Sequence, residues 1–265
     1  METLDTLLVR SRKALDEGMT EDALGFARKA GDIDPDCVDA LLLQAEALSE
    51  LGKIQEAVAF FEEGLRRSPD DLDALYSLGD LYFELSQRKK AIETYEKILK
   101  LDAEEADAWV SIGLVHFNQE EMEKALSAYD KALKIEPDST FAMISRGDVL
   151  YALGQNEQAV ACFTSALETD PQDPQAHYSL AEIYYDLGRL EEAKNCCQKA
   201  IELDPGLSFA YLTLGNIYLD LDESLKALNN FQAFLRREKS AESKQICDEV
   251  EAVVQGLKAE LEEGA

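Results

Sequence analysis

The sequence predicts an all-α solenoid built from repeated pairs of helices and closed by one further helix. Three observations carry this prediction. A 34-residue pattern recurs seven times from Leu4 to Ala241, one column of it is alanine in every copy, and the last stretch of the chain leaves the frame but keeps a helical period. Repeats of this length mark stacked helix pairs, because each pair can bury its apolar face only against its neighbours.

The repeated blocks keep one frame without insertion or deletion. They are expected to span residues 4–37, 38–71, 72–105, 106–139, 140–173, 174–207 and 208–241. In the third block Leu75, Leu78, Gly79 and Tyr82 recur at i, i+3, i+4 and i+7, which is one face of a helix. A turn follows, and then a second segment with the same period, so each block predicts two helices.

Two columns of small residues predict close packing between these two helices. The alanine column contains Ala23, Ala57, Ala91, Ala125, Ala159, Ala193 and Ala227. The column twelve residues earlier contains Ser11, Ala45, Gly79, Gly113, Gly147, Ala181 and Gly215. Glycine inside a helix costs roughly 1 kcal/mol relative to alanine. Its recurrence therefore predicts a backbone that lies too close to a neighbour for a side chain.

Glycine and proline mark the ends of the predicted helices. Gly18, Gly52, Gly154 and Gly188 fall in the turn, where a left-handed residue ends a helix. Prolines at positions 35, 69, 137, 171 and 205 disfavour continuation of the second helix. Arg10, Gln44 and Arg146 depart from the pattern, since their column is apolar in most other blocks.

The fourth block carries a resemblance to a known family. Trp109, Ile112, Gly113, His116, Ala125, Tyr129 and Pro137 fall at the spacing of the tetratricopeptide repeat (TPR). The chain resembles a TPR protein over residues 4–241. The resemblance implies a right-handed superhelix in which the first helix of each pair lines a concave groove that binds peptides.

Residues 242–262 are expected to form a C-terminal capping helix. Ile246, Val250, Val253, Val254, Leu257 and Leu261 form one apolar stripe, with glutamates elsewhere. The last repeat of a solenoid leaves an apolar face uncovered, and a helix with a polar back can close it. The alternative is that this helix docks on a partner.

Charge and cysteine usage bound the partners and the compartment. The chain has 54 acidic and 26 basic residues and a formal net charge of -28, so nucleic acid and anionic membranes are poor partners. Its start has no signal-peptide pattern, and no run of 18 apolar residues predicts a membrane span. Five cysteines without a C-x-x-C pair favour reduced thiols and a cytoplasmic setting.

The free face of the predicted first helices is acidic. From the second block to the seventh it carries Asp39, Glu46, Asp73, Asp80, Asp107, Asp148, Glu182 and Asp220. The second helices of the third and fourth blocks instead mix signs, as Lys97, Lys131 and Lys134 among glutamates show, which is typical of a solvated surface. The acidic bias is thus concentrated on one type of helix, although a coat that only confers solubility is the alternative.

Aromatic and hydroxyl side chains share this face. The aromatics are Tyr76, Phe83, Phe117, Tyr151, Tyr178 and Tyr185. The hydroxyls form a ladder at 34-residue spacing: Ser77, Ser111, Ser145, Ser179 and Thr213. Aromatics offer contact area and can hold arginine or lysine, and hydroxyls suit the backbone of an extended peptide. The alternatives are packing of Phe83, Phe117, Tyr151 and Tyr185 against the adjacent repeat, and a plain polar surface for the hydroxyls.

The pattern excludes one ligand that the resemblance brings with it. Many TPR co-chaperones hold the carboxylate end of a chaperone tail with lysine, asparagine and arginine on their first helices. Here the candidates are Asn216 and the pair Arg12 and Lys13, at opposite ends of the repeats. A carboxylate-terminated chaperone tail is therefore not expected to bind in the middle of the groove.

No catalytic group is predicted. His116 and His177 fall in columns that are apolar or aromatic elsewhere, and Cys197 falls where other blocks have phenylalanine or tyrosine, so all three are expected to pack in the core. No phosphate loop, nucleophile motif, metal cluster or cofactor motif is present.

The sequence thus predicts a non-catalytic scaffold or adaptor that binds a basic or mixed basic-apolar peptide or protein surface. A protein that self-associates through exposed helices or the C-terminal helix, and a regulatory subunit of an enzyme, are the alternatives.

Overall fold

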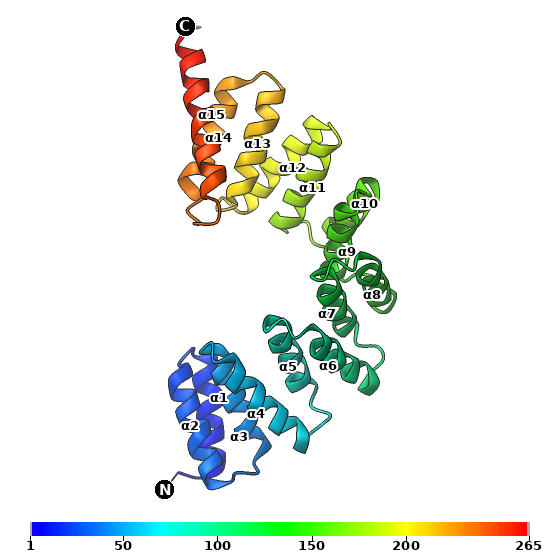
Figure 1. The fold of residues 1–265 in the computed structure, drawn as a ribbon, viewed down its shortest axis with the longest axis vertical. Coiled ribbons are helices and arrows are strands. Elements are labelled where there is room, and N and C mark those ends of the chain that lie inside the picture. The colour runs from blue at the N-terminus through cyan, green and yellow to red at the C-terminus, as the bar shows by residue number, and fades with distance from the viewer. Residues whose placement is uncertain (1, 264–265) are drawn as a thin grey trace. The chain divides into compact units, whose positions relative to one another are not determined.

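The computed structural model describes residues 2–263 of the chain, and every regular element in this range is an α-helix (Figure 1). The chain divides into two compact units, and the division falls between Ile135 and Glu136 in the sequence. Unit 1 contains α1 (Leu4–Asp16), α2 (Thr20–Ile33), α3 (Val38–Glu50), α4 (Ile54–Arg67), α5 (Leu72–Glu84), α6 (Arg88–Leu101), α7 (Ala106–Phe117) and α8 (Met122–Ile135). Unit 2 contains α9 (Thr140–Ala152), α10 (Asn156–Thr169), α11 (Pro174–Asp186), α12 (Leu190–Leu203), α13 (Ser208–Asp220), α14 (Ser224–Arg237) and α15 (Lys244–Glu263).

The helices pack in consecutive antiparallel pairs, as the repeat pattern predicts. Each odd-numbered helix from α1 to α13 begins at the first residue of a 34-residue block, and the next helix packs against it. Within each unit the second helix of a pair also contacts the first helix of the following pair, for example α4 with α5 and α12 with α13. We call α1, α3, α5, α7, α9, α11 and α13 the first helices, and their partners the second helices.

The core lies between the paired helices, where the two small-residue columns meet aromatic rings. All seven alanines of the alanine column are fully buried. A Cβ atom added to Gly79 would lie 2.5 Å from Cε1 of Tyr95, and one added to Gly113 would lie 2.5 Å from Cε1 of Tyr129. Gly147 and Gly215 face Phe163 and Phe231 in the same way. The glycines are therefore required by the rings that lie sixteen residues later in the chain.

The turn between the paired helices needs a left-handed residue in every repeat. Gly18, Gly52, Gly154 and Gly188 have φ near +70°, as predicted. The equivalent residues of the remaining pairs are Ser86, Glu120 and Asp222, with φ between 57° and 59°. These three side chains accept a conformation that costs roughly 1–2 kcal/mol for a residue with a Cβ atom, because the same i+5 hydrogen bond closes each turn, as from Gln87 N to Tyr82 O.

The residues that depart from the apolar column are accommodated individually. Gln44 is buried and donates from Nε2 to the Ala40 carbonyl at 3.0 Å. Arg146 is half-buried, and its Nη1 lies 3.0 Å from Sγ of Cys162. The guanidinium of Arg10 lies 4.0 Å from the centre of the Phe26 ring. In each case a polar head finds a partner while its stem covers apolar surface.

The C-terminal helix α15 packs against α14 at the end of unit 2 (Figure 1). Val250, Val254 and Leu257 are buried in a cluster with Phe231 and Phe234 of α14. Two members of the predicted stripe, Ile246 and Val253, remain 37% and 40% exposed. The helix thus covers the last repeat, and its apolar stripe is wider than the surface that α14 offers.

Replacement of Gly79 by alanine should lower the stability of unit 1 by about 1–3 kcal/mol, because the new methyl group overlaps the buried Tyr95 ring. The matched control is Gly25→Ala in α2, where nothing lies within 4 Å of the added Cβ. That control should gain up to about 1 kcal/mol from its better helix propensity. Urea midpoints from circular dichroism measure both, and equal gains in the two variants would contradict the close approach at Gly79.

Candidate functional site

Five carboxylates on the first helices of unit 1 face solvent wholly or in part. Asp39, Asp73, Asp80 and Asp107 are exposed and Glu46 is half-buried. No lysine or arginine of the described residues comes within 4.0 Å of these five carboxylates. We call this surface, together with its counterpart in unit 2, the first-helix acidic face. It is open to a cation that comes from another molecule.

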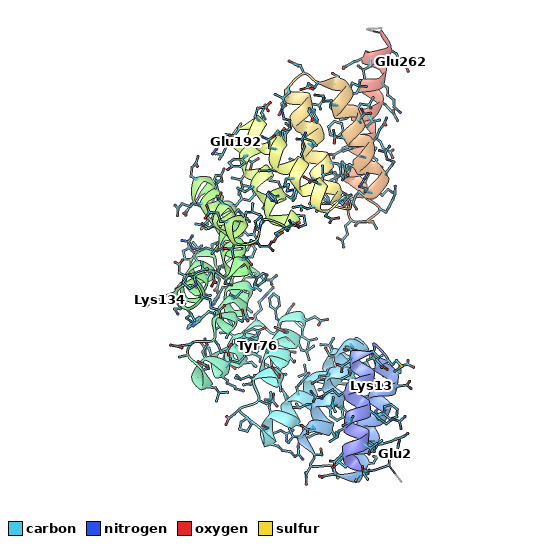
Figure 2. The ribbon with its side chains drawn as sticks, turned by 180° about the vertical axis from the view of Figure 1, so that it is seen from behind. Glu2, Lys13, Tyr76, Lys134, Glu192 and Glu262 are labelled. Carbon is cyan, nitrogen blue, oxygen red and sulfur yellow. The ribbon has the colours of Figure 1, made fainter. Side chains whose placement is uncertain are left out.

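Tyrosine hydroxyls hold some of these carboxylates in place. Tyr95 of α6 donates to Oδ1 of Asp80 at 2.6 Å, and Tyr76 of α5 donates to Oε2 of Glu105 at 3.1 Å. Burial and the acceptor carboxylate raise the pKa of both tyrosines, so they remain neutral donors. The Tyr76 ring also lies 6.5 Å from the Tyr95 ring, centre to centre, and Figure 2 labels Tyr76 on α5.

Unit 2 contains the most perturbed carboxyl group of the acidic face. Burial, helped by the nearby charge of Glu182, raises the pKa of Asp148 to about 6. Burial also raises the pKa of Glu182, although the hydrogen bond that Tyr178 donates to it at 2.8 Å opposes the shift. Neither carboxylate has an ion pair among the described residues. The two groups therefore form a half-buried negative site without a counter-charge.

Two tyrosines of unit 2 connect consecutive repeats. Tyr151 of α9 donates to Oδ2 of Asp186 in α11 at 2.7 Å. Tyr185 of α11 is hydrogen-bonded in the equivalent way to Asp220 of α13, and burial with this contact raises its pKa to about 12. Both rings are half-buried. These residues thus combine a contact to the adjacent repeat with a ring edge that remains accessible.

The structure separates the predicted site residues by exposure. Ser145, Tyr178 and Thr213 are buried, with exposed fractions of 6–8%, so they offer little surface to a ligand. Ser145 and Thr213 belong to the hydroxyl ladder, whose other members are half-buried, while Tyr178 lies in a different column and packs against Ala200 and Ala210. The remaining predicted hydroxyl, aromatic and amide residues are half-buried: Ser77, Phe83, Ser111, Phe117, Ser179 and Asn216. Phe83 packs against the core of unit 1, which is the alternative that the sequence left open.

The residues considered for catalysis have structural environments. Cys197 is buried, as predicted, and burial raises the pKa of its thiol to about 12. His116 is half-buried, and its Nδ1 lies 2.7 Å from Oε2 of Glu121. His177 is also half-buried, with Nε2 3.2 Å from the Pro171 carbonyl oxygen. Both histidines lie at the edge of the core and are tied to the turn beside their own helix.

A polar and aromatic cluster on α7 and α8 of unit 1 was not predicted from the sequence. Trp109 and Lys131 line two adjoining hollows on α7 and α8, and the Lys131 ammonium lies 3.7 Å from the centre of the Trp109 ring. The sequence did contain a signal for this cluster, because α8 carries several lysines and pairs with the helix that carries the motif tryptophan. Trp109 entered the prediction only as a residue of the family motif, so this signal was not used.

Two searches of residues 2–263 bound the chemistry further. No group of three or more histidine, cysteine, aspartate or glutamate side chains there has a geometry that could hold a metal ion. None of the described helices has the length and apolar character that a membrane crossing requires.

Comparison with protein-family models identifies the family of the chain. Five tetratricopeptide repeat models match it, over residues 14–65, 76–140, 147–188, 174–207 and 196–229. The chain therefore belongs to the tetratricopeptide repeat family, whose members are scaffolds for protein interactions. A search of curated proteins found no match.

Solved structures resemble the chain in fold. A tetratricopeptide repeat protein from Parabacteroides merdae is 20% identical and aligns with a TM-score of 0.73, over 95% of this chain and 98% of that one. The pilF protein of Pseudomonas aeruginosa is 18% identical with a TM-score of 0.66, over 82% and 97% of the two chains. YrrB, described as a TPR protein with an unusual peptide-binding site, is 25% identical with a TM-score of 0.52, over 69% and 95%.

The perturbed carboxyl of Asp148 gives a pH-dependent stability. Between about pH 4 and pH 6 the folded chain binds a proton there that the unfolded chain has released, so stability falls as pH rises through this window. Asp148→Asn cannot ionise. It should stabilise unit 2 by about 1–2 kcal/mol at pH 7, after a discount for partial exposure, and have almost no effect below pH 4.

Thermal unfolding of this variant at the two pH values measures the effect. Glu251→Gln, at an exposed position of α15, is the matched neutralisation and should change stability by less than about 0.5 kcal/mol at either pH. A gain in Asp148→Asn of the same size at both pH values would show that the raised pKa is not its source.

Proposed function

We propose that the chain is a non-catalytic scaffold or adaptor whose first-helix acidic face binds a basic or mixed basic-apolar segment of another protein. The observation that carries the proposal is that eight carboxylates on the first helices have no ion pair among the described residues. The chain contains 26 basic residues, and many pair within the second helices or their turns.

Each unit by itself offers a different contact to such a segment. In unit 1 the exposed Asp73, Asp80 and Asp107 would attract a basic segment at long range, and the half-buried ring of Tyr76 would contact it. In unit 2 a lysine or arginine side chain near Asp148 and Glu182 would supply the counter-charge that these half-buried groups lack. Such a contact is worth more than an exposed ion pair, because the site is already partly desolvated.

Aromatic edges and hydroxyls would complete the contact. Tyr151 and Tyr185 are fixed by their hydrogen bonds to Asp186 and Asp220, so their rings lose little conformational entropy when a ligand arrives. Ser77, Ser111 and Ser179 are half-buried and would reach the backbone of an extended segment. A carboxylate-terminated chaperone tail finds only like charge in the middle of this face, so we propose that it does not bind there.

Charge reversal should remove this binding. We expect partners that the wild-type chain retains from a source lysate at low salt to be lost when Asp73, Asp80, Asp107 and Asp148 are changed to lysine. The same partners should be released by about 0.5 M salt, because the attraction is between accessible charges. Capture on immobilised chain followed by mass spectrometry identifies them, and titration of the identified segment gives the affinity.

The matched control changes the same number of carboxylates on the second helices, with Glu56, Glu96, Glu123 and Glu168 all converted to lysine. All four are exposed, and the net charge changes equally. The partner should remain bound to this control. Loss of the partner from both variants would mean that only net charge matters, and its retention by both would move the site away from the first helices.

The exposed part of the α15 stripe favours self-association as a second candidate function. Ile246 and Val253 lie one above the other on this helix and are left uncovered by α14. Changing both to lysine should keep the fold and abolish any self-association seen by sedimentation. Val250→Lys, in the buried part of the stripe, should instead destabilise unit 2 by more than about 2 kcal/mol, because it buries an unpaired charge. A chain that sediments as a monomer at high concentration excludes this function.

A further inference from the structure

Two adjoining hollows lie along the α7–α8 pair of unit 1. One has a volume of about 460 Å³ and is lined by Glu104, Trp109, Lys131, Lys134 and Ile135. The other has a volume of ≈ 200 Å³ and is lined by Trp109, Ile112, His116, Lys124, Ser127, Ala128 and Lys131. Because Trp109 and Lys131 line both, the hollows form one surface depression, which we call the Trp109 site.

The Trp109 site combines an apolar wall with uncompensated positive charge. Trp109 is half-buried, and Ile112 and Ile135 continue the apolar surface on either side of it. Lys131 and Lys134 are exposed and have no carboxylate within 4.0 Å among the described residues. Lys131 instead lies over the Trp109 ring, at 3.7 Å from its centre.

Of the other charged groups of the site, Lys124 and His116 contact Glu121, whereas Glu104 is unpaired among the described residues and offsets part of the positive charge. Lys124 forms an ion pair with Glu121 at 2.8 Å, and Glu121 also lies 2.7 Å from Nδ1 of His116. Glu104 is the acidic residue that lines the larger hollow. The site therefore presents two free ammonium groups next to an indole ring, in a chain whose formal net charge is -28.

The spacing of the lysines fits an extended segment. Lys124, Lys131 and Lys134 follow one side of α8, so the rise of a helix places the first and last about 15 Å apart along its axis. An extended peptide advances about 3.3 Å per residue, and five residues cover the same length. Carboxylates of such a peptide could reach the free Lys131 and Lys134 while one apolar side chain rests on Trp109, and the rest of the segment would extend along α8 toward Lys124.

We propose that the Trp109 site binds an acidic peptide segment that carries an apolar side chain between its carboxylates. Charge complementarity selects this occupant, since Lys131 and Lys134 lack an acidic partner in their own unit. Two free cations are too few to hold a nucleic acid against the repulsion of a strongly acidic chain. The site lies on other residues than the first-helix acidic face and takes the opposite charge, so one chain would hold two segments of opposite sign. Figure 2 labels Lys134, which marks the α8 side of the site.

Tryptophan fluorescence reports on this site without an added label, because Trp109 is the single tryptophan of the sequence. The capped peptide Glu-Glu-Leu-Glu-Glu is titrated into the full chain while tryptophan emission is followed. We expect a saturable change, and an affinity that falls at least threefold when salt is raised from about 0.05 M to about 0.3 M. The peptide Glu-Glu-Ser-Glu-Glu, without the apolar side chain, should bind at least threefold more weakly.

The double variant Lys131→Glu, Lys134→Glu should raise the dissociation constant at least tenfold. Its matched control is Lys97→Glu, Lys100→Glu on α6, which makes the same charge change at two exposed positions outside the site. That control should change the constant less than threefold. Unchanged circular dichroism midpoints in both variants exclude unfolding as the cause.

Four outcomes would overturn the proposal. They are the absence of a saturable change, equal weakening in the two double variants, equal affinity for the leucine and serine peptides, and a stronger response to a single-stranded oligonucleotide than to the peptide. A concentration-dependent change in emission without any peptide, lost in Lys131→Glu, Lys134→Glu, would instead assign the site to a second copy of the chain. None of these readouts depends on the first-helix acidic face.

Discussion

The close approach of the paired helices is the constraint on which the rest of the structure depends. A glycine on the first helix receives an aromatic ring from the second, as Gly79 receives Tyr95 and Gly113 receives Tyr129. The fully buried alanine column lies on the second helix of the same pair. This contact fixes which side of every first helix is buried, and therefore which side is free. Uncharged aromatic rings fill the packing side of the first helices, so their carboxylates lie on the free side and form the acidic face.

The same contact links the core to the site. The Tyr95 ring that requires Gly79 ends in a hydroxyl that donates to Asp80, one residue further along the chain. A core ring thus positions a carboxylate of the acidic face. In the third pair the small residue, the ring and the carboxylate are directly linked, so a change at Gly79 would affect both the stability of the pair and the position of a surface carboxylate. Where phenylalanine replaces the tyrosine, as at Phe163, this link is absent, and the nearby Asp148 has only Glu182 as a charged neighbour of consequence for its pKa.

The sequence predicted the fold closely because repeated packing leaves a repeated residue pattern. Seven alanines in one column can be read without coordinates, and so can the glycines of the turns. The burial of Tyr178 and Thr213 could not be read in this way, because a small rotation of a helix decides whether a residue at the edge of its free face meets solvent or the next repeat. The pKa of Asp148 likewise depends on how deeply a neighbouring repeat covers it. The Trp109 site was missed because Trp109 entered the prediction only as part of the family motif, and the hollow beside it depends on how neighbouring side chains pack, which the repeat pattern does not record.

The distribution of charge over the two types of helix connects these sites. Helix α8 holds its lysines beside an indole ring, while the first helices of the same unit present aspartates without counter-ions. Lysines on the second helices and aspartates on the first would neutralise each other if they faced the same side, but the helical pairing separates them by a layer of buried rings. Opposite charges that are kept apart in this way cost stability, because neither gains from the other and Asp148 is partly desolvated as well. Stability given up at accessible charged groups is typical of surfaces that receive a partner, and this argument supports the two proposals over a uniform solvated coat.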